Sequence, residues 1–284
     1  MLEIITISNG CLTASINTYG AELVSLKKDG FENIWEGNPD VWAGHAPILF
    51  PICGKLRDGK YTHCGNEYFM SGHGFAKRSL FILEEKSENS ATFLLKSNEE
   101  TRKCYPFDFE FRAKFTLIDN SLTIEYITTN TGSCEMYFSV GSHEAYACPE
   151  GIEEYSLVFD AEEDLHNSLL TGPLLNHQHD TFGKACELPL KYEYFPERDT
   201  LIFEKLKTRK VSLVHRPTGR KTVVDFTGSD KLLIWTMDGA KFLCIEPWCG
   251  LPDFVDTDYD ITKKAGIMSL APNETIAKSH TITL

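Results

Sequence analysis

Short hydrophobic runs separated by turn-forming dipeptides dominate the first half of the chain. Near the N-terminus, apolar and β-branched residues gather in three such runs, Leu2–Ile7, Leu12–Ile16 and Ala21–Leu26. Asn9-Gly10 follows the first run and Asp29-Gly30 follows the third, and both dipeptides are strong signals of tight hairpin turns. The pattern therefore predicts antiparallel strands joined by short connections.

The same pattern continues along most of the chain. Phe109, Phe111 and Phe115 alternate with polar residues, as a half-buried strand requires. Further strands are predicted over Tyr61–Met70, Thr92–Lys96, Phe107–Leu117, Ser121–Thr129, Tyr155–Phe159, Thr200–Phe203, Val211–His215, Lys221–Phe226 and Lys231–Met237.

Only one segment has the character of a helix. Asn98–Cys104 has room for a turn or two, and Pro106 ends it. His166–Cys186 has the weakest periodicity, which predicts a long loop. With no internal repeat and no low-complexity linker, we predict an all-β fold: one large antiparallel domain over residues 1–284, built as a sandwich or a barrel.

Composition narrows the possible functions. The formal net charge of −13 argues against binding to nucleic acid or to an anionic membrane surface. No run approaches the length of a membrane-spanning helix, and the N-terminus lacks the features of a signal peptide. The nine cysteines are scattered singly, which favours reduced thiols and a cytoplasmic location over a disulfide framework.

The stretch Lys241–Asp253, KFLCIEPWCGLPD, contains the best candidate for chemistry. Glu246 follows a short apolar strand, where a carboxylate is costly to bury without a partner. We expect Pro247 to end that strand, because proline removes a backbone donor. The alternative for Glu246 is a structural role as an acceptor of local backbone hydrogen bonds.

Three other segments carry side chains suited to a binding cleft. APILFPICGKLRDGK contributes Lys55 and Arg57 to an irregular segment. GHGFAKR places His73 between two glycines and ends in Lys77 and Arg78. FSVGSHEAY places His143 just beyond an apolar strand, where a side chain projects readily from a scaffold.

Some familiar chemistries are not indicated. His177 and His179 have a spacing seen in some metal sites, but their polar surroundings offer no further ligand set, so no metal is predicted. Ser142 lacks the surroundings of a nucleophile elbow, and the chain has no phosphate-binding glycine loop. No cofactor is predicted.

Five segments in order resemble the aldose 1-epimerase (galactose mutarotase-like) superfamily, and most closely its LacX-type bacterial branch. They are GAELVSL, FPICGKLRDGKY, HGFAKRSLF, SVGSHEAY and IEPWCGLPD. The resemblance implies the large antiparallel β-sandwich of that superfamily. It also implies a cytoplasmic isomerase that interconverts the α and β anomers of a hexose or related sugar, working as a monomer or a homodimer.

The resemblance assigns roles position by position. His143 matches the general acid that protonates the ring oxygen, and Glu246 matches the general base that deprotonates the anomeric hydroxyl. His73 matches a histidine that orients the sugar, and Asp199 looks like an aspartate that binds its hydroxyls. The family arginine falls at Lys55 or Arg57.

Four further residues depart from the family pattern or extend it. In HGFAKR the usual arginine is Lys77, with Arg78 next, and lysine cannot make the two-pronged contact of arginine. Trp248 and Trp42 could form an aromatic platform under the sugar or could pack in the core.

Three alternatives remain open at this point. A sugar phosphate could be the substrate, with Lys55, Arg57, Lys77 and Arg78 binding the phosphate. The protein could be a non-catalytic sugar-binding module or sensor. A glycosidase could use Asp199 and Glu246 as paired carboxylates.

Overall fold

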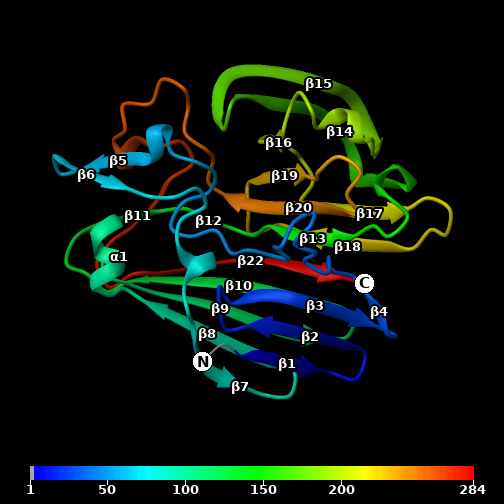
Figure 1. Ribbon diagram of the computed structural model, residues 1–284, viewed down its shortest axis with the longest axis horizontal. Helices are drawn as coiled ribbons and strands as arrows, with labels where there is room; N and C mark the ends of the chain where they lie inside the picture. Colours follow the sequence, from blue (N-terminus) through cyan, green and yellow to red (C-terminus); the bar gives the residue numbers. More distant parts are fainter. Residues whose placement is uncertain (1–2) are drawn as a thin grey trace.

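The computed structural model describes residues 3–284, which are built mainly from antiparallel strands (Figure 1). Leu2, the first residue of the first predicted strand, lies outside the described residues. The strands are β1 Ile4–Ser8, β2 Leu12–Asn17, β3 Glu22–Lys28, β4 Phe31–Glu32, β5 Lys60–His63, β6 Asn66–Phe69, β7 Ile82–Lys86, β8 Ser90–Lys96, β9 Phe109–Ile118, β10 Ser121–Asn130, β11 Met136–Phe138, β12 Val140–Gly141, β13 Glu144–Ala147, β14 Tyr155–Thr171, β15 Leu174–Pro189, β16 Leu201–Phe203, β17 Lys210–His215, β18 Lys221–Asp225, β19 Lys231–Trp235, β20 Phe242–Cys249, β21 Met268–Leu270 and β22 Thr275–Thr283. The helix α1 is Glu99–Cys104, and 3-10 helices lie at Arg57–Gly59, Ala76–Arg78, Ile152–Glu154, Tyr192–Tyr194 and Ile261–Lys263.

The predicted helix is present and its ends have clear causes. The side chain of Asn98 accepts a hydrogen bond from the backbone N–H of Thr101, and the Thr101 side chain accepts one from the backbone of Asn98. This reciprocal capping satisfies two donors that the first turn leaves free. Tyr105 leaves the helical conformation just before Pro106, as the sequence predicts.

A nine-stranded sheet, ordered β15-β14-β17-β18-β22-β10-β9-β8-β7, forms one layer of the molecule. The strict alternation of buried and half-buried residues in β9 and β10 confirms the period-two pattern of the phenylalanines. Phe111 and Phe115 point into the same core as Ile7 and Ile16 of the β1–β4 sheet. The two sheets therefore bury their apolar faces together, which confirms the large antiparallel β-sandwich.

A five-stranded sheet carries the segment that contains Glu246. Its order is β12-β20-β19-β16, and β13 also pairs with β20. β20 (orange in Figure 1) is buried along its whole length. Leu243 and Ile245 pack in the main core, whereas Phe242 and Cys244 belong to a separate cluster on the opposite face. Because side chains alternate along a strand, Glu246 lies on that opposite face.

The expected end of this strand at Pro247 is wrong, because β20 continues to Cys249. On one side Pro247 pairs with Leu232 of β19, and on the other its carbonyl accepts a hydrogen bond from the backbone N–H of Ser142. The hydrogen bond that Pro247 cannot donate is replaced from a side chain. The indole Nε1–H of Trp248 donates to the carbonyl of Ser142 at 3.1 Å.

The predicted loop at His166–Cys186 is also wrong, since this segment lies in the long hairpin of β14 and β15. Register shifts interrupt the pairing, and they break the two-residue period that would reveal a strand. Buried polar groups obscure the pattern further. Asn167 accepts a hydrogen bond from the backbone of Ile202, and Glu163 accepts two from the segment that follows β16.

None of the helices among residues 3–284 has the length and apolar character that a bilayer crossing requires.

Candidate active site

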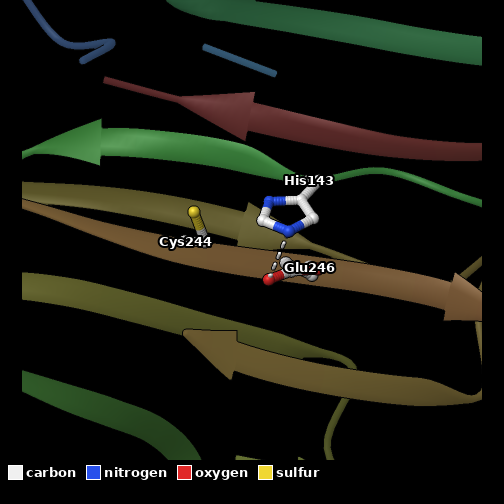
Figure 2. Close-up of side chains that lie close together, drawn as sticks. All are labelled: His143, Cys244 and Glu246. Atoms are coloured by element: carbon white, nitrogen blue, oxygen red, sulfur yellow. Dashed lines mark ion pairs between the residues drawn. The ribbon is translucent and has the colours of Figure 1, made fainter. Parts of the chain in front are cut away.

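His143 and Glu246 lie opposite each other, with His143 between β12 and β13 and Glu246 in β20. The register between β12 and β20 is the same as that between β13 and β20, so the two residues that separate β12 from β13 fall opposite Pro247 and Glu246. The imidazole Nε2 lies 3.4 Å from the carboxylate Oε1 (Figure 2). The side chain of His143 is 14% exposed and that of Glu246 is 2% exposed.

A pocket of about 370 Å³ opens over this pair. His73, Lys77, Asp199 and Trp248, all predicted from the sequence, contribute to its wall, as does Trp42. The remaining lining residues are Gly44, Pro47, Leu49, Thr200 and Trp235. The structure thus brings together residues from five separate segments of the chain around one acid–base pair.

His73 is held with a defined ring orientation. Its backbone N–H donates to the carbonyl of Gly54, and the Gly54 backbone N–H donates to the ring Nδ1 at 3.3 Å. Because Nδ1 accepts, the ring proton resides on Nε2, which is then a donor for a ligand oxygen. Gly54 has a φ of +73°, and a Cβ there would come within 2.6 Å of Pro252.

The ring of Trp248 forms a wall and not an open platform. It is 3% exposed and packs edge-on against His73, with ring centroids 5.5 Å apart. Gly141, directly opposite in β12, permits this position, because a Cβ there would lie 2.8 Å from the indole. Trp248 therefore supports the strand pairing and the pocket at the same time.

Three comparisons with known proteins show what the chain is similar to. The model of the aldose 1-epimerase family matches residues 3–283. The chain is 36% identical to the plasmid-encoded LacX protein of Lactococcus lactis subsp. lactis, over 99% of both proteins.

The chain belongs to the aldose 1-epimerase family. Two solved structures share its fold along nearly the whole chain. A galactose mutarotase related enzyme from Lactobacillus acidophilus is 32% identical, with a TM-score of 0.94 over 99% of this chain and 97% of the other. A galactose mutarotase-like protein from Lactobacillus casei ATCC 334 is 29% identical, with a TM-score of 0.93 over 99% of each chain.

Two aromatic rings surround His143 in this aldose 1-epimerase family member. Trp42 stacks on the imidazole, with centroids 5.3 Å apart and an interplanar angle of 28°. Trp235 meets the imidazole edge-on at 5.6 Å. Trp235 was not predicted as a site residue, although its place at the end of an apolar strand, shortly before the Glu246 strand, is a usable signal. Only three-dimensional pairing of β19 with β20 shows that it faces the pocket.

Burial governs the protonation of the pair. Desolvation lowers the pKa of His143 to about 4, below the range near neutrality in which an exposed histidine titrates. Desolvation also raises the pKa of Glu246 well above that of an exposed carboxylate, and the nearby Glu144 raises it further. Both shifts favour a pair that is neutral overall and holds one proton.

Positive charge collects beside the pocket. Burial lowers the pKa of Lys77 to about 8, and the charges of Arg78 and Lys55 lower it further. Lys55 lines an adjoining pocket of about 430 Å³, which shares Asp199 with the first. Within residues 3–284, no carboxylate forms an ion pair with any of these three cations.

Arg57 and Arg78 do not line the main pocket. The Arg57 guanidinium donates to the carbonyl of Thr257 and lies over the ring of Tyr259. Arg78 is exposed and donates to the hydroxyl of Ser71. Of the two residues considered for the family arginine, Lys55 therefore lines the pocket that adjoins the main one, and Arg57 lines neither.

The two histidines of the polar segment have other partners. His177 forms an exposed ion pair with Asp256 at 2.8 Å and stacks on Phe254. His179 contacts the hydroxyl of Ser168. Among the described residues, the group with the geometry of metal ligands is a different one, His143, Cys244 and Glu246.

Proposed function

We propose that this protein is an aldose 1-epimerase that interconverts the α and β anomers of a hexose by acid–base opening and closing of the ring. One observation carries the proposal: His143 and Glu246 face each other at 3.4 Å in the floor of a pocket lined by aromatic and polar side chains. Membership of the aldose 1-epimerase family supports it.

The reaction needs one donor and one acceptor at the same time. The ring oxygen gains a proton while the anomeric hydroxyl loses one, so the protein's proton count is unchanged by ring opening. A histidine–carboxylate pair that holds one proton meets this need. In the proposed cycle His143 protonates the ring oxygen and Glu246 accepts the proton of the anomeric hydroxyl.

The free pair must first reach the reactive form. Burial favours the carboxylic acid beside a neutral imidazole, so the proton passes from Glu246 to His143 before or as the sugar binds. The stacked indole of Trp42 favours this transfer, because the face of an aromatic ring attracts a cation. Trp42 thus offsets part of the cost of charging a buried histidine.

The other pocket residues hold the sugar while its anomeric carbon turns. The Nε2–H of His73 is available to a ring or hydroxyl oxygen, and Asp199 is available to accept from hydroxyl groups. After opening, the aldehyde must rotate before the ring closes on its other face. A pocket that grips the remaining hydroxyls and leaves this carbon free allows that rotation.

Substitution of the pair tests the proposal. Glu246→Gln and His143→Asn should each lower catalysed anomerisation by about 10²–10⁴-fold, the range for one general acid or base. Exchange between the anomeric protons of galactose or glucose, followed by saturation-transfer NMR, measures the rate above buffer.

Asp256→Asn and His177→Asn are matched controls, because they alter an exposed histidine–carboxylate pair outside the pocket. Both controls should keep the native rate. An unchanged rate in Glu246→Gln would overturn the assignment of the base, and wild-type protein that binds sugar without exchange would identify a sugar-binding module. Release of nitrophenol from a nitrophenyl hexoside would instead support the glycosidase alternative.

A hexose phosphate is the second candidate substrate, favoured by the unpaired cations. Lys55 and Lys77 face pockets that meet at Asp199, in a chain whose formal net charge is −13. A phosphate on the sugar would neutralise them. If so, Lys77→Met should raise the KM for the phosphorylated hexose far more than that for the free hexose, and equal changes would argue against a phosphate site.

A further inference from the structure

Cys244 lies beside the proposed acid–base pair and has no part in the proposed reaction. It precedes Glu246 by two residues in β20, so both side chains leave the strand on the same face. Figure 2 shows the Sγ of Cys244 and the carboxylate of Glu246 on the side of β20 where the His143 ring lies. One ligand atom from each of the three residues lies within 4.8 Å of the others.

We propose that His143, Cys244 and Glu246 form a binding site for a thiophilic divalent cation such as Zn²⁺, and that its occupation blocks the proposed reaction. The residue types fit, because imidazole, thiolate and carboxylate are the usual protein ligands of Zn²⁺. The site itself is inferred from the geometry, and only its inhibitory effect rests on the proposed function.

The spacing of the pair suits a tetrahedral ion. Nitrogen and oxygen ligands about 2.1 Å from Zn²⁺ are about 3.4 Å apart at the tetrahedral angle. His143 Nε2 and Glu246 Oε1 are separated by 3.4 Å, so an ion can bridge them with little movement. Cys244 is fully buried and must approach the ion by rotation of its side chain. The fourth position then faces the pocket, which also provides the route of entry.

Metal binding and sugar chemistry need the same atoms. The ion would take the lone pair of Nε2 and the charge of the Glu246 carboxylate, and Cys244 would release its thiol proton to solvent. The surroundings favour reversible binding. The Nδ1 atom of His143 has no hydrogen-bond partner in the structure, whereas strongly held metal ligands usually have one.

Cobalt binding tests the site without any measurement of turnover. Co²⁺ added to the reduced wild-type protein should give visible bands of a tetrahedral ion and a sulfur-to-cobalt charge-transfer band. Cys244→Ala should lose the charge-transfer band of this site. Cys148→Ala is the matched control, because Cys148 is equally buried and outside the ligand set, and it should keep the band.

Exposed thiols are an alternative source of the band. Cys11, Cys64, Cys134 and Cys186 are exposed, so their fourfold replacement by serine provides the background in which the test is made. In that background, excess galactose should displace Co²⁺ from the pocket. Retention of the band in Cys244→Ala, or its absence from the fourfold variant with Cys244 intact, would overturn the proposed site.

Zinc inhibition tests whether occupation of the metal site blocks the proposed reaction. Zn²⁺ should inhibit anomerisation in competition with sugar, and EDTA should restore the rate. Cys244→Ala should keep the uninhibited rate, because the thiol does not line the pocket, and should need at least tenfold more Zn²⁺ for half inhibition. Equal sensitivity of Cys244→Ala and wild type to Zn²⁺ would refute the assignment of Cys244 as the third metal ligand. A protein that binds Co²⁺ but never catalyses anomerisation would retain the site and refute only the enzymatic function.

Discussion

At the scale of single residues, the central feature is a histidine and a glutamate that share one proton in a buried place. Burial shifts the two pKa values in opposite directions, downward for His143 and upward for Glu246. The pair consequently keeps its single proton over a wide range of pH. An exposed histidine–carboxylate pair would lose its single proton at a pH close to neutrality, where an exposed histidine titrates.

This protonation predicts the pH dependence of the proposed reaction. The value of kcat/KM should be level through neutral pH and fall as the pH drops through about 4. At that pH His143 becomes charged, so the pair holds two protons and has no group left to accept one. On the alkaline side it should fall only well above the usual carboxyl range, where Glu246 loses the last proton. A pH–rate profile with an inflection near the ordinary pKa of histidine would contradict the shared-proton account.

Trp42 is expected to matter for catalysis more than for stability. Trp42→Leu removes the ring stacked on His143 and should lower kcat/KM by about 2–10-fold, the value of one aromatic pair of about 0.5–1.5 kcal/mol. Trp42→Phe retains an aromatic face and should recover most of the rate. Steady-state rates of both variants measure the effect on catalysis, and thermal unfolding of both measures the effect on stability. Equal losses in Leu and Phe variants would show that stacking is not the cause.

At the scale of elements, β20 was only partly predictable from the sequence. The apolar run before Glu246 identified a strand, and a proline normally ends one. Two events distant in sequence override that rule: the partner strand is interrupted at Ser142, and the Trp248 indole supplies the missing donor. Neither can be deduced from the neighbours of Pro247 in the chain.

The loop after β20 is anchored by a buried ion pair. The Nζ of Lys264 donates to the Asp253 carboxylate at 2.8 Å and to the carbonyl of Leu251. Asp253 in turn donates its backbone N–H to the carbonyl of Lys55 and accepts from the backbone of Arg57. This network fixes the segment whose Gly54 N–H orients His73.

Loss of that anchor should be costly. Lys264→Met leaves the Asp253 charge buried without its partner and should lower the free energy of unfolding by about 3–5 kcal/mol. Lys263→Met is the matched control, because the adjacent lysine pairs with Asp258 at the surface and should cost about 1 kcal/mol or less. Urea unfolding followed by tryptophan fluorescence gives both values, and similar losses in the two variants would contradict this role for Lys264.

At the scale of the whole molecule, sequence patterns predicted the architecture better than they predicted the site. Regular alternation marked β9 and β10 correctly, but β14 and β15 escaped because bulges and buried polar residues erased their period. Glu246 and His143 were candidates from the residues around them, and their roles as base and acid came from a family resemblance. Pairing of β19 with β20 was needed to show that Trp235 faces the pocket, and the nearness of Cys244 to His143 depends on the fold. The contact that keeps Arg57 from the pocket, with Thr257, is distant in sequence and could not be predicted from neighbouring residues.

The distribution of charge over the whole molecule gives a further prediction. If phosphorylated hexoses are substrates, their KM should rise as the pH increases through about 8, where Lys77 loses its charge. It should also rise with ionic strength, since screening weakens attraction between exposed charges. Free hexoses should show neither trend. Parallel KM measurements on both sugars test this, and identical behaviour of the two would exclude an electrostatic role for Lys77 in substrate binding.

The proposed reacting groups and the proposed recognition groups are attached to the protein in different ways. Glu246 lies in β20 and His143 joins β12 to β13, which both pair with β20, so their separation cannot change without disturbing the sheet. Asp199, Lys55 and Lys77 stand on connections between strands, where insertions and replacements are tolerated. Under the proposed function, changes in these connections can therefore alter which sugar enters while the His143–Glu246 spacing stays the same, and exchange of these connections between relatives should transfer sugar preference without loss of turnover.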